Sequence, residues 1–198
     1  MQSEVAQVYL SADADMPTFE LALERWRQAH PGAFAGRNLP GCWGAGDFSI
    51  ELRGHDAASL QALPGIEGVD RLSHVRIGGG ERAPGLSGGV LRTLLLRVRA
   101  DVPAGQVEAL ERELLAMPDY MAGIRNWQLC RVTSASDWTH VWQQEFAEVG
   151  DLHGEYLLHP YHWGWVDRRF DPAFPEWTVE AICHAYCPLP ESILTAAQ

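Results

Sequence analysis

The sequence ALER occupies Ala22–Arg25 and returns unchanged at Ala109–Arg112. Four more matches keep the same order and nearly the same spacing, namely ADMP and ADVP (14–17 and 100–103), Pro31 and Pro118, GDFSIEL and SDWTHVW (46–52 and 136–142), and SHVRI and CHAYC (73–77 and 183–187). Each match is weak by itself, but five matches in one register indicate a duplicated unit. Both halves must then adopt the same order of elements.

Each half predicts the same series of strands and helices. A short apolar strand opens the unit and an amphipathic helix follows, with an apolar stripe formed by Phe19, Leu23 and Trp26 in the first half and by Val107, Leu110, Leu114 and Met117 in the second. Two strands, a second helix and a last strand complete the unit. This order, βαββαβ, is the ferredoxin-like pattern, in which helices cover one face of an antiparallel sheet.

The uncovered face of each sheet is partly apolar and needs a partner. We therefore predict an α+β fold in which two ferredoxin-like units pack sheet against sheet into an α/β barrel, as a pseudo-dimer within one chain. The expected boundaries are residues 1–77 for the first half and residues 90–198 for the second. Between them, residues 78–89 (GGGERAPGLSGG) contain six glycines and are expected to form a flexible linker.

Composition limits the classes of function. The 198 residues carry 26 acidic and 15 basic side chains, for a net charge of −11, which argues against a nucleic-acid partner. No apolar run reaches the roughly 18 residues that a membrane helix needs, and the N-terminus lacks a secretory pattern. We expect a cytoplasmic protein with a small, neutral or apolar ligand, either as a monomer or as a homodimer paired through its outer strands.

The strand DWTHVWQQEF, residues 137–146, contains the first candidate site residue. Alternate side chains of a strand share a face, so Trp138, His140 and Trp142 should point the same way. In the following helix, expected over about 150–158, Tyr156 and His159 lie on one side. Pro160 should end or kink that helix. His162 would then fall in the turn beyond it and could fold back towards His140.

These side chains suit acid–base chemistry. An imidazole exchanges a proton near neutral pH, and a tyrosine hydroxyl can donate to a carbonyl oxygen or a developing enolate. The candidate catalytic residues are Tyr156, His162 and His140, and the candidate pocket residues are Trp138, Trp142, His159, Trp163 and His184. The alternative interpretation is a set of core side chains that only satisfy backbone groups.

Metal binding is the other possibility for these histidines. His140, His159, His162 and His184 are all candidate ligands, and CHAYC (183–187) adds two cysteines to the last of them. However, the chain has no HExxH or CxxC spacing. We therefore predict neither a metal nor a cofactor, and expect the four cysteines to be free thiols.

The stretch DWTHVWQQEFAEVGDLHGEYLLHPYH, residues 137–162, resembles the signature of the stress-responsive A/B barrel family, also called Dabb, for dimeric α/β barrel. The resemblance covers about residues 91–186 and implies a ferredoxin-like fold that pairs through its sheets. Most members have no assigned activity, but a few are plant polyketide cyclases with an aldol reaction or fern hydroxynitrile lyases. The acid/base pair of the cyclases corresponds to Tyr156 and His162, and their strand histidine to His140.

Two departures from the family pattern affect this prediction. Arg92 stands near the place where the cyclases carry another histidine, and Ile50 stands where His140 would be in the first half. One site is therefore expected, in the second half. Two functions remain open: a cofactor-independent lyase or cyclase acting on a small carbonyl compound, and a non-catalytic stress-responsive barrel that binds an apolar molecule or is purely structural. A pocket beside Tyr156 would favour the first.

Overall fold

The computed structural model describes residues 3–53 and 57–195, which form two series of strands and helices. The first series is β1 (Ser3–Leu10), α1 (Met16–Ala29), β2 (Phe34–Arg37), β3 (Phe48–Arg53), the 3-10 helix η1 (Ala57–Ala62) and β4 (Ile66–Glu81). The second is β5 (Ser87–Val98), α2 (Ala104–Tyr120), β6 (Ile124–Val132), β7 (His140–Phe146), α3 (Val149–Asp151), η2 (Leu152–Tyr156), η3 (His162–Val166), η4 (Asp167–Arg169) and β8 (Val179–Glu191). The repeated order agrees with the duplication in the sequence.

All eight strands form one antiparallel sheet in the order β2-β3-β1-β4-β6-β7-β5-β8. Strand β4 pairs with β1 of its own half and with β6 of the other. At the opposite end, the chain after β2 reaches β8: Leu39 N donates to Tyr186 O at 2.9 Å, and the backbones of Trp43 and His184 donate to each other. Because both ends of the sheet meet, the predicted α/β barrel of two ferredoxin-like units is confirmed.

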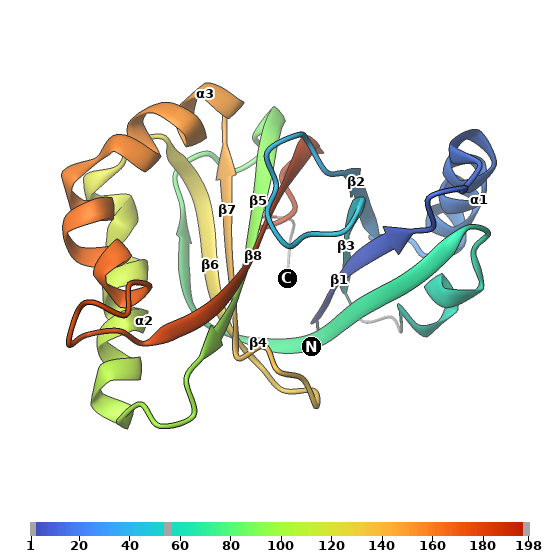
Figure 1. The fold of residues 1–198 in the computed structure, drawn as a ribbon. Helices are drawn as coiled ribbons and strands as arrows, with labels where there is room; N and C mark the ends of the chain where they lie inside the picture. The colour runs from blue at the N-terminus through green and yellow to red at the C-terminus, as the bar shows by residue number, and fades with distance from the viewer. Residues whose placement is uncertain (1–2, 54–56, 196–198) are drawn as a thin grey trace.

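The layers run helix, sheet, sheet, helix (Figure 1). Helix α1 covers the outer face of β1–β3, and α2 with the segment after α3 covers the outer face of β5–β7. Both predicted helical stripes face these sheets, since Phe19, Leu23 and Trp26 are buried in one core and Leu110, Leu114 and Met117 in the other. Among the described residues, no helix is long and apolar enough to cross a membrane.

The inner faces of the two sheets meet through both apolar and polar side chains. Val5, Leu95 and Val141 form part of an apolar cluster there. Beside it, Gln143 of β7 donates to the carboxylate of Glu51 on β3, which joins the two halves across the barrel. Buried polar groups are stable only when hydrogen-bonded, so this pairing fixes how the halves face each other.

The prediction of a flexible linker over residues 78–89 is wrong. Gly78–Glu81 continue β4 and pair with β6, and residues 87–89 begin β5, so only residues 82–86 connect the two strands. The glycines are needed for close packing: a Cβ on Gly78 would lie 2.6 Å from Leu115 Cδ1, and one on Gly80 would lie 2.5 Å from the Trp127 ring.

The contact between β2 and β8 can be tested through Gly36. A Cβ added there would lie 2.5 Å from Cys187 Sγ on β8, so Gly36→Ala should lower the free energy of unfolding by about 1–3 kcal/mol in urea titrations. Cys187→Ala in the same chain should restore part of the loss. Gly105→Ala is the matched control, because a Cβ there meets nothing within 4 Å and should cost no stability. Equal effects at both glycines would contradict this packing.

Candidate functional site

The helical segment after β7 is interrupted just before Pro160. It begins as α3, continues as the wide π turns of η2, breaks at His159 and resumes as a helix that includes η3. His159 starts the resumed segment, because its Nδ1 accepts from Tyr161 N at 3.1 Å and its carbonyl accepts from His162 N at 2.9 Å. Pro160 is tolerated there, since the first helical position needs no N–H partner. His162 therefore lies in a helix, and its predicted place in a turn was wrong.

Tyr156 faces the sheet from η2 and is almost fully buried, with 2% exposure. Its hydroxyl accepts from Arg92 Nη1 of β5 at 2.9 Å, and the same nitrogen donates to Gln144 Oε1 of β7 at 2.5 Å. Burial raises the pKa of Tyr156, against the lowering effect of the Arg92 charge. The phenol therefore keeps its proton at neutral pH.

The ring of His162 packs edge-on against Tyr156, with 4.8 Å between the ring centroids. Its Nδ1 lies 3.2 Å from Asp167 Oδ1, and the side chain is 12% exposed. The structure thus brings together two of the three candidate catalytic residues. Nδ1 makes no hydrogen bond of normal geometry within the described residues, so the carboxylate acts on the ring through its charge.

His140 does not join this pair. Its Nε2 lies 3.0 Å from Glu111 Oε1 of α2 and its Nδ1 lies 2.9 Å from Thr139 Oγ1, while burial lowers its pKa against the effect of Glu111. The predicted convergence was wrong because His140 lies four residues before Gln144, about 13 Å along the strand. At that point α2, and not the later segment, covers the sheet.

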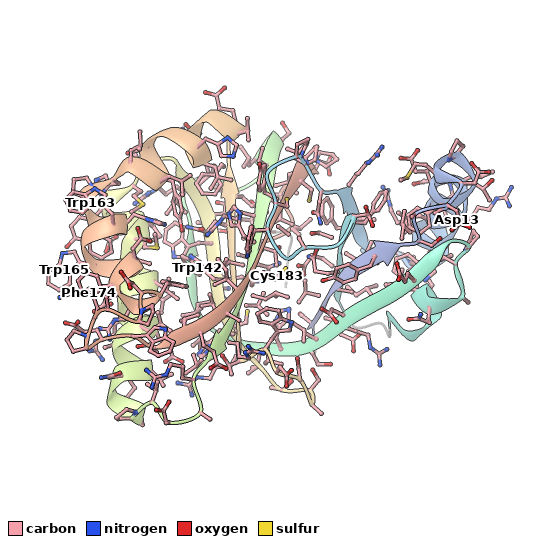
Figure 2. The ribbon with its side chains drawn as sticks, viewed as in Figure 1. Asp13, Trp142, Trp163, Trp165, Phe174 and Cys183 are labelled. Carbon is pink, nitrogen blue, oxygen red and sulfur yellow. The ribbon has the colours of Figure 1, made fainter. Side chains whose placement is uncertain are left out.

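The candidate pocket residues also lie in different parts of the structure. Trp142 is fully buried between the sheet and the helices, whereas Trp163 is exposed on the outer surface with Trp165 and Phe174 (Figure 2). His159 begins the helical segment that contains Pro160 and His162, as described above. Trp138 packs between the two sheets, because β7 begins only at His140 and the alternation of faces does not extend back to residue 138.

His184 lies on β8 beside the Tyr156 cluster. Its ring is 5.6 Å from that of Tyr186, whose other side meets the His153 ring at 5.3 Å. Burial, with the positive charges of Arg92 and the two neighbouring histidines, lowers the pKa of His184 to about 3. A neutral imidazole therefore stands at this edge of the cluster at neutral pH.

The first half of the chain forms one wall of the site. The Tyr186 hydroxyl donates to Pro40 O, and Tyr186 N donates to Cys42 Sγ at 3.2 Å. Gly41 permits this approach, since a Cβ there would lie 2.5 Å from the Tyr186 hydroxyl. The loop between β2 and β3 thus closes over the β8 side of a cluster whose other residues come from the second half.

Four members of the cluster were not predicted as site residues. They are Arg92, which departs from the family pattern, and Gln144, His153 and Tyr186. The sequence carries a signal for two of them: Arg92 is a charge in a mostly apolar strand, and Tyr186 shares the face of His184 because it follows two residues later. No sequence pattern indicates that His153 meets Tyr186.

The register of the two halves also corrects the comparison of His140 with Ile50. Leu96 and Val8 each precede their helix by eight residues and pair with His140 and Phe48 respectively. Phe48 is therefore the counterpart of His140, and Ile50 that of Trp142. Since Phe48, Ile50 and Leu52 are buried in an apolar core, the first half offers no second copy of the cluster.

Metal ligation finds no support in the geometry. In residues 3–53 and 57–195, no group of three His, Cys, Asp or Glu side chains could hold a metal ion. In CHAYC, Cys183 points between the sheets (Figure 2) while His184 faces the helical side, so the stretch does not converge on one ion. The absence of a metal or cofactor stays a prediction.

A cavity of about 420 Å³ lies away from this cluster, beside β4 and the 135–138 loop. Two of its charged lining residues already have partners within the protein: Arg97 Nε is 2.9 Å from Glu180 Oε1, and the Tyr9 hydroxyl donates to Asp70 Oδ2 at 3.3 Å.

Comparisons with known proteins place the chain among barrels of this type. Residues 90–180 match the family model described as Stress Responsive A/B Barrel Domain. A comparison with curated protein sequences gives no match. Two proposed monooxygenases are similar in structure: one from Fusobacterium nucleatum (TM-score 0.63, 6% identity, 96% of this chain and 92% of that chain) and one from Lactobacillus acidophilus (0.56, 8%, 94% and 92%). A heme-degrading enzyme from Listeria monocytogenes is also similar (0.55, 8%, 94% and 99%). At these identities, the likeness establishes the two-unit fold.

The lowered pKa of His184 predicts a pH dependence of stability. An unfolded histidine titrates near pH 6.5 and the folded one near 3, so between these values the unfolded chain binds more protons. The free energy of unfolding should fall as the pH drops from about 6.5 towards 3, by at most about 1.4 kcal/mol per pH unit. Urea titrations of His184→Gln should show a shallower slope than wild type, and an unchanged slope would contradict the prediction.

Proposed function

We propose that the second half of the chain, whose residues 90–180 match the model of the stress responsive A/B barrel domain, binds a small carbonyl compound beside Tyr156 and moves a proton on it without a cofactor. The reaction would be of the lyase or aldol-type cyclase class. The observation that carries the proposal is the contact between a buried tyrosine and a histidine that lies beside a carboxylate.

Tyr156 would polarise the carbonyl oxygen of the substrate. Arg92 Nη1 donates into the phenolic oxygen, which leaves the phenolic proton for an acceptor other than Arg92. The hydroxyl donates to Met117 Sδ at 3.8 Å, and a thioether is a weak acceptor. A substrate oxygen would be a better one, and donation to it would stabilise the negative charge of an enolate.

His162 would accept the proton from the carbon next to the carbonyl. With a proton on Nδ1, the free electron pair of Nε2 would take the proton, and the electron pair of the broken C–H bond would become the enolate. Asp167 Oδ1, which lies 3.2 Å from Nδ1, would support the imidazolium that forms by its charge. His140 has no part in it, since it is occupied by Glu111.

The non-catalytic alternative also has a specific observation in its favour. Tyr156 belongs to the apolar core of the second half and packs against Phe146 at 5.6 Å between ring centroids. In that case, Tyr156, Arg92 and Gln144 would be a polar network that fastens the helical segment to the sheet. Such a barrel would bind an apolar molecule or serve a structural role.

Single substitutions distinguish these functions. The assays are hydrogen–deuterium exchange next to the carbonyl of small ketones, followed by NMR, and cleavage of mandelonitrile, followed by the absorbance of benzaldehyde. Tyr156→Phe and His162→Gln should each lower kcat by roughly 10²–10⁴-fold, while Tyr156→Phe should cost only about 1 kcal/mol of stability.

His140→Gln and Trp163→Ala are the controls, because both residues lie outside the contact pair and should keep at least half of the wild-type kcat. Loss of several kcal/mol of stability in Tyr156→Phe, with no wild-type turnover of any of these compounds, would favour the structural alternative.

A further inference from the structure

Arg92 carries a buried charge that the surrounding protein leaves uncompensated. The side chain is 4% exposed. It donates to two neutral acceptors, the Tyr156 hydroxyl and Gln144 Oε1. Within residues 3–53 and 57–195, no carboxylate forms an ion pair with it. A buried ion is costly unless it meets an opposite charge, and burial accordingly lowers the pKa of Arg92.

Three N–H donors around the Tyr156 hydroxyl have no hydrogen bond of normal geometry. In the described part of the chain, Arg92 Nε, Trp142 Nε1 and Gln144 Nε2 are buried without such a partner, although Trp142 and Gln144 lie near enough to the Tyr156 oxygen to lower its pKa. Arg92 and Gln144 are directly opposed in the β5–β7 ladder, and Trp142 lies two residues away on the same face. Orphan donors are rare in folded proteins and often mark the place of a missing ligand atom. An acceptor with several lone pairs placed at this face would satisfy all three.

We propose that this site binds the carboxylate group of an organic acid, with Arg92 as its counter-charge and Trp142 and Gln144 as further donors. A carboxylate has two oxygens and about four acceptor positions, which matches a guanidinium fork and two further N–H groups. The inference rests on the proposed function and deepens it: the substrate becomes a keto acid, whose carbonyl oxygen meets Tyr156 while its carboxylate meets Arg92.

The neighbouring charges favour one negative group on the ligand. The other ionisable side chains of the cluster are three histidines, which cannot carry a negative charge, and Tyr156 and Tyr186, whose pKa values are raised by burial. Asp167 is placed beside His162, and Glu111 of α2 is taken by Arg131 and His140. Within the described residues, the buried Arg92 guanidinium therefore has no carboxylate partner, and one carboxylate on the ligand would neutralise it.

The surroundings favour an organic acid over an inorganic anion. The rings of Trp142, Phe146, Tyr156 and Tyr186 belong to the same core cluster as the site. An apolar body attached to the carboxylate would gain by packing against such rings, whereas phosphate or chloride would not. The proposal therefore predicts that affinity depends on both the charge and the apolar body of the ligand.

Isothermal titration of the full chain at constant ionic strength tests the inference with matched probes. Phenylacetate should bind at least tenfold more tightly than phenylacetamide, which has the same body without the charge, and more tightly than acetate, phosphate or chloride. Arg92→Met should lose at least tenfold in affinity for phenylacetate and leave phenylacetamide unchanged. Arg27→Met, the same replacement on the surface of α1, should change neither.

Thermal unfolding guards against a folding defect. Arg92→Met removes an unpaired buried charge, so without ligand its Tm should equal or exceed that of wild type. Should that variant fail to fold, Arg92→Lys keeps the charge without the planar fork and should bind phenylacetate with an affinity reduced at least threefold. Equal binding of phenylacetate and phenylacetamide, or equal binding of chloride and phenylacetate, would overturn the inference.

The titration also separates this inference from the proposed function, because binding is measured without turnover. If phenylacetate binds through Arg92 while Tyr156→Phe leaves every turnover unchanged, the proposed chemistry fails and the carboxylate site stands. If neutral ketones are turned over by Tyr156 and His162 while phenylacetate does not bind, the carboxylate site alone fails.

Discussion

The open face of an antiparallel sheet is the constraint on which the rest of this structure depends. In each half, helices cover the outer face of the sheet, and the inner face is covered by the other half. Two ladders make the arrangement continuous: β4 against β6, and the chain after β2 against β8. Because backbone hydrogen bonds run through both contacts, neither half could move away without leaving buried N–H and C=O groups unpaired.

The same closure shapes the candidate site. Strand β8 carries His184 and Tyr186 towards the helical side of the second half, and the loop that pairs with it belongs to the first half. A contact that completes the barrel is therefore also a wall of the site. The core of the second half supplies Tyr156 and Arg92, so the candidate site is built from both halves of the chain.

Local periodicity predicted the elements well and their meeting points poorly. The ALER repeat and the apolar stripes correctly predicted helices α1 and α2. The alternation of side chains along a strand placed Trp142 and Gln144 on one face. His140 shares that face. Tertiary packing decides which helix covers each end of β7, and the helix beside His140 is α2, which contributes Glu111. The glycines of residues 78–81 suggested freedom of the backbone, whereas in the fold they make room for Leu115 and Trp127. A glycine in a sequence is compatible both with a flexible backbone and with close packing, so glycine alone does not distinguish the two.

The five residues between β4 and β5 have a consequence for how such a barrel can change. In a symmetric homodimer, every substitution appears twice, once in each subunit, and both sites must tolerate it. Here a short covalent connection holds two different sequences together, and the effective concentration of each for the other is high without any symmetry. One half can therefore fill its helical side with Phe48, Ile50 and Leu52, while the other keeps a polar cluster at the matching positions. The connection makes asymmetry possible, and the restriction of the candidate site to the second half agrees with it.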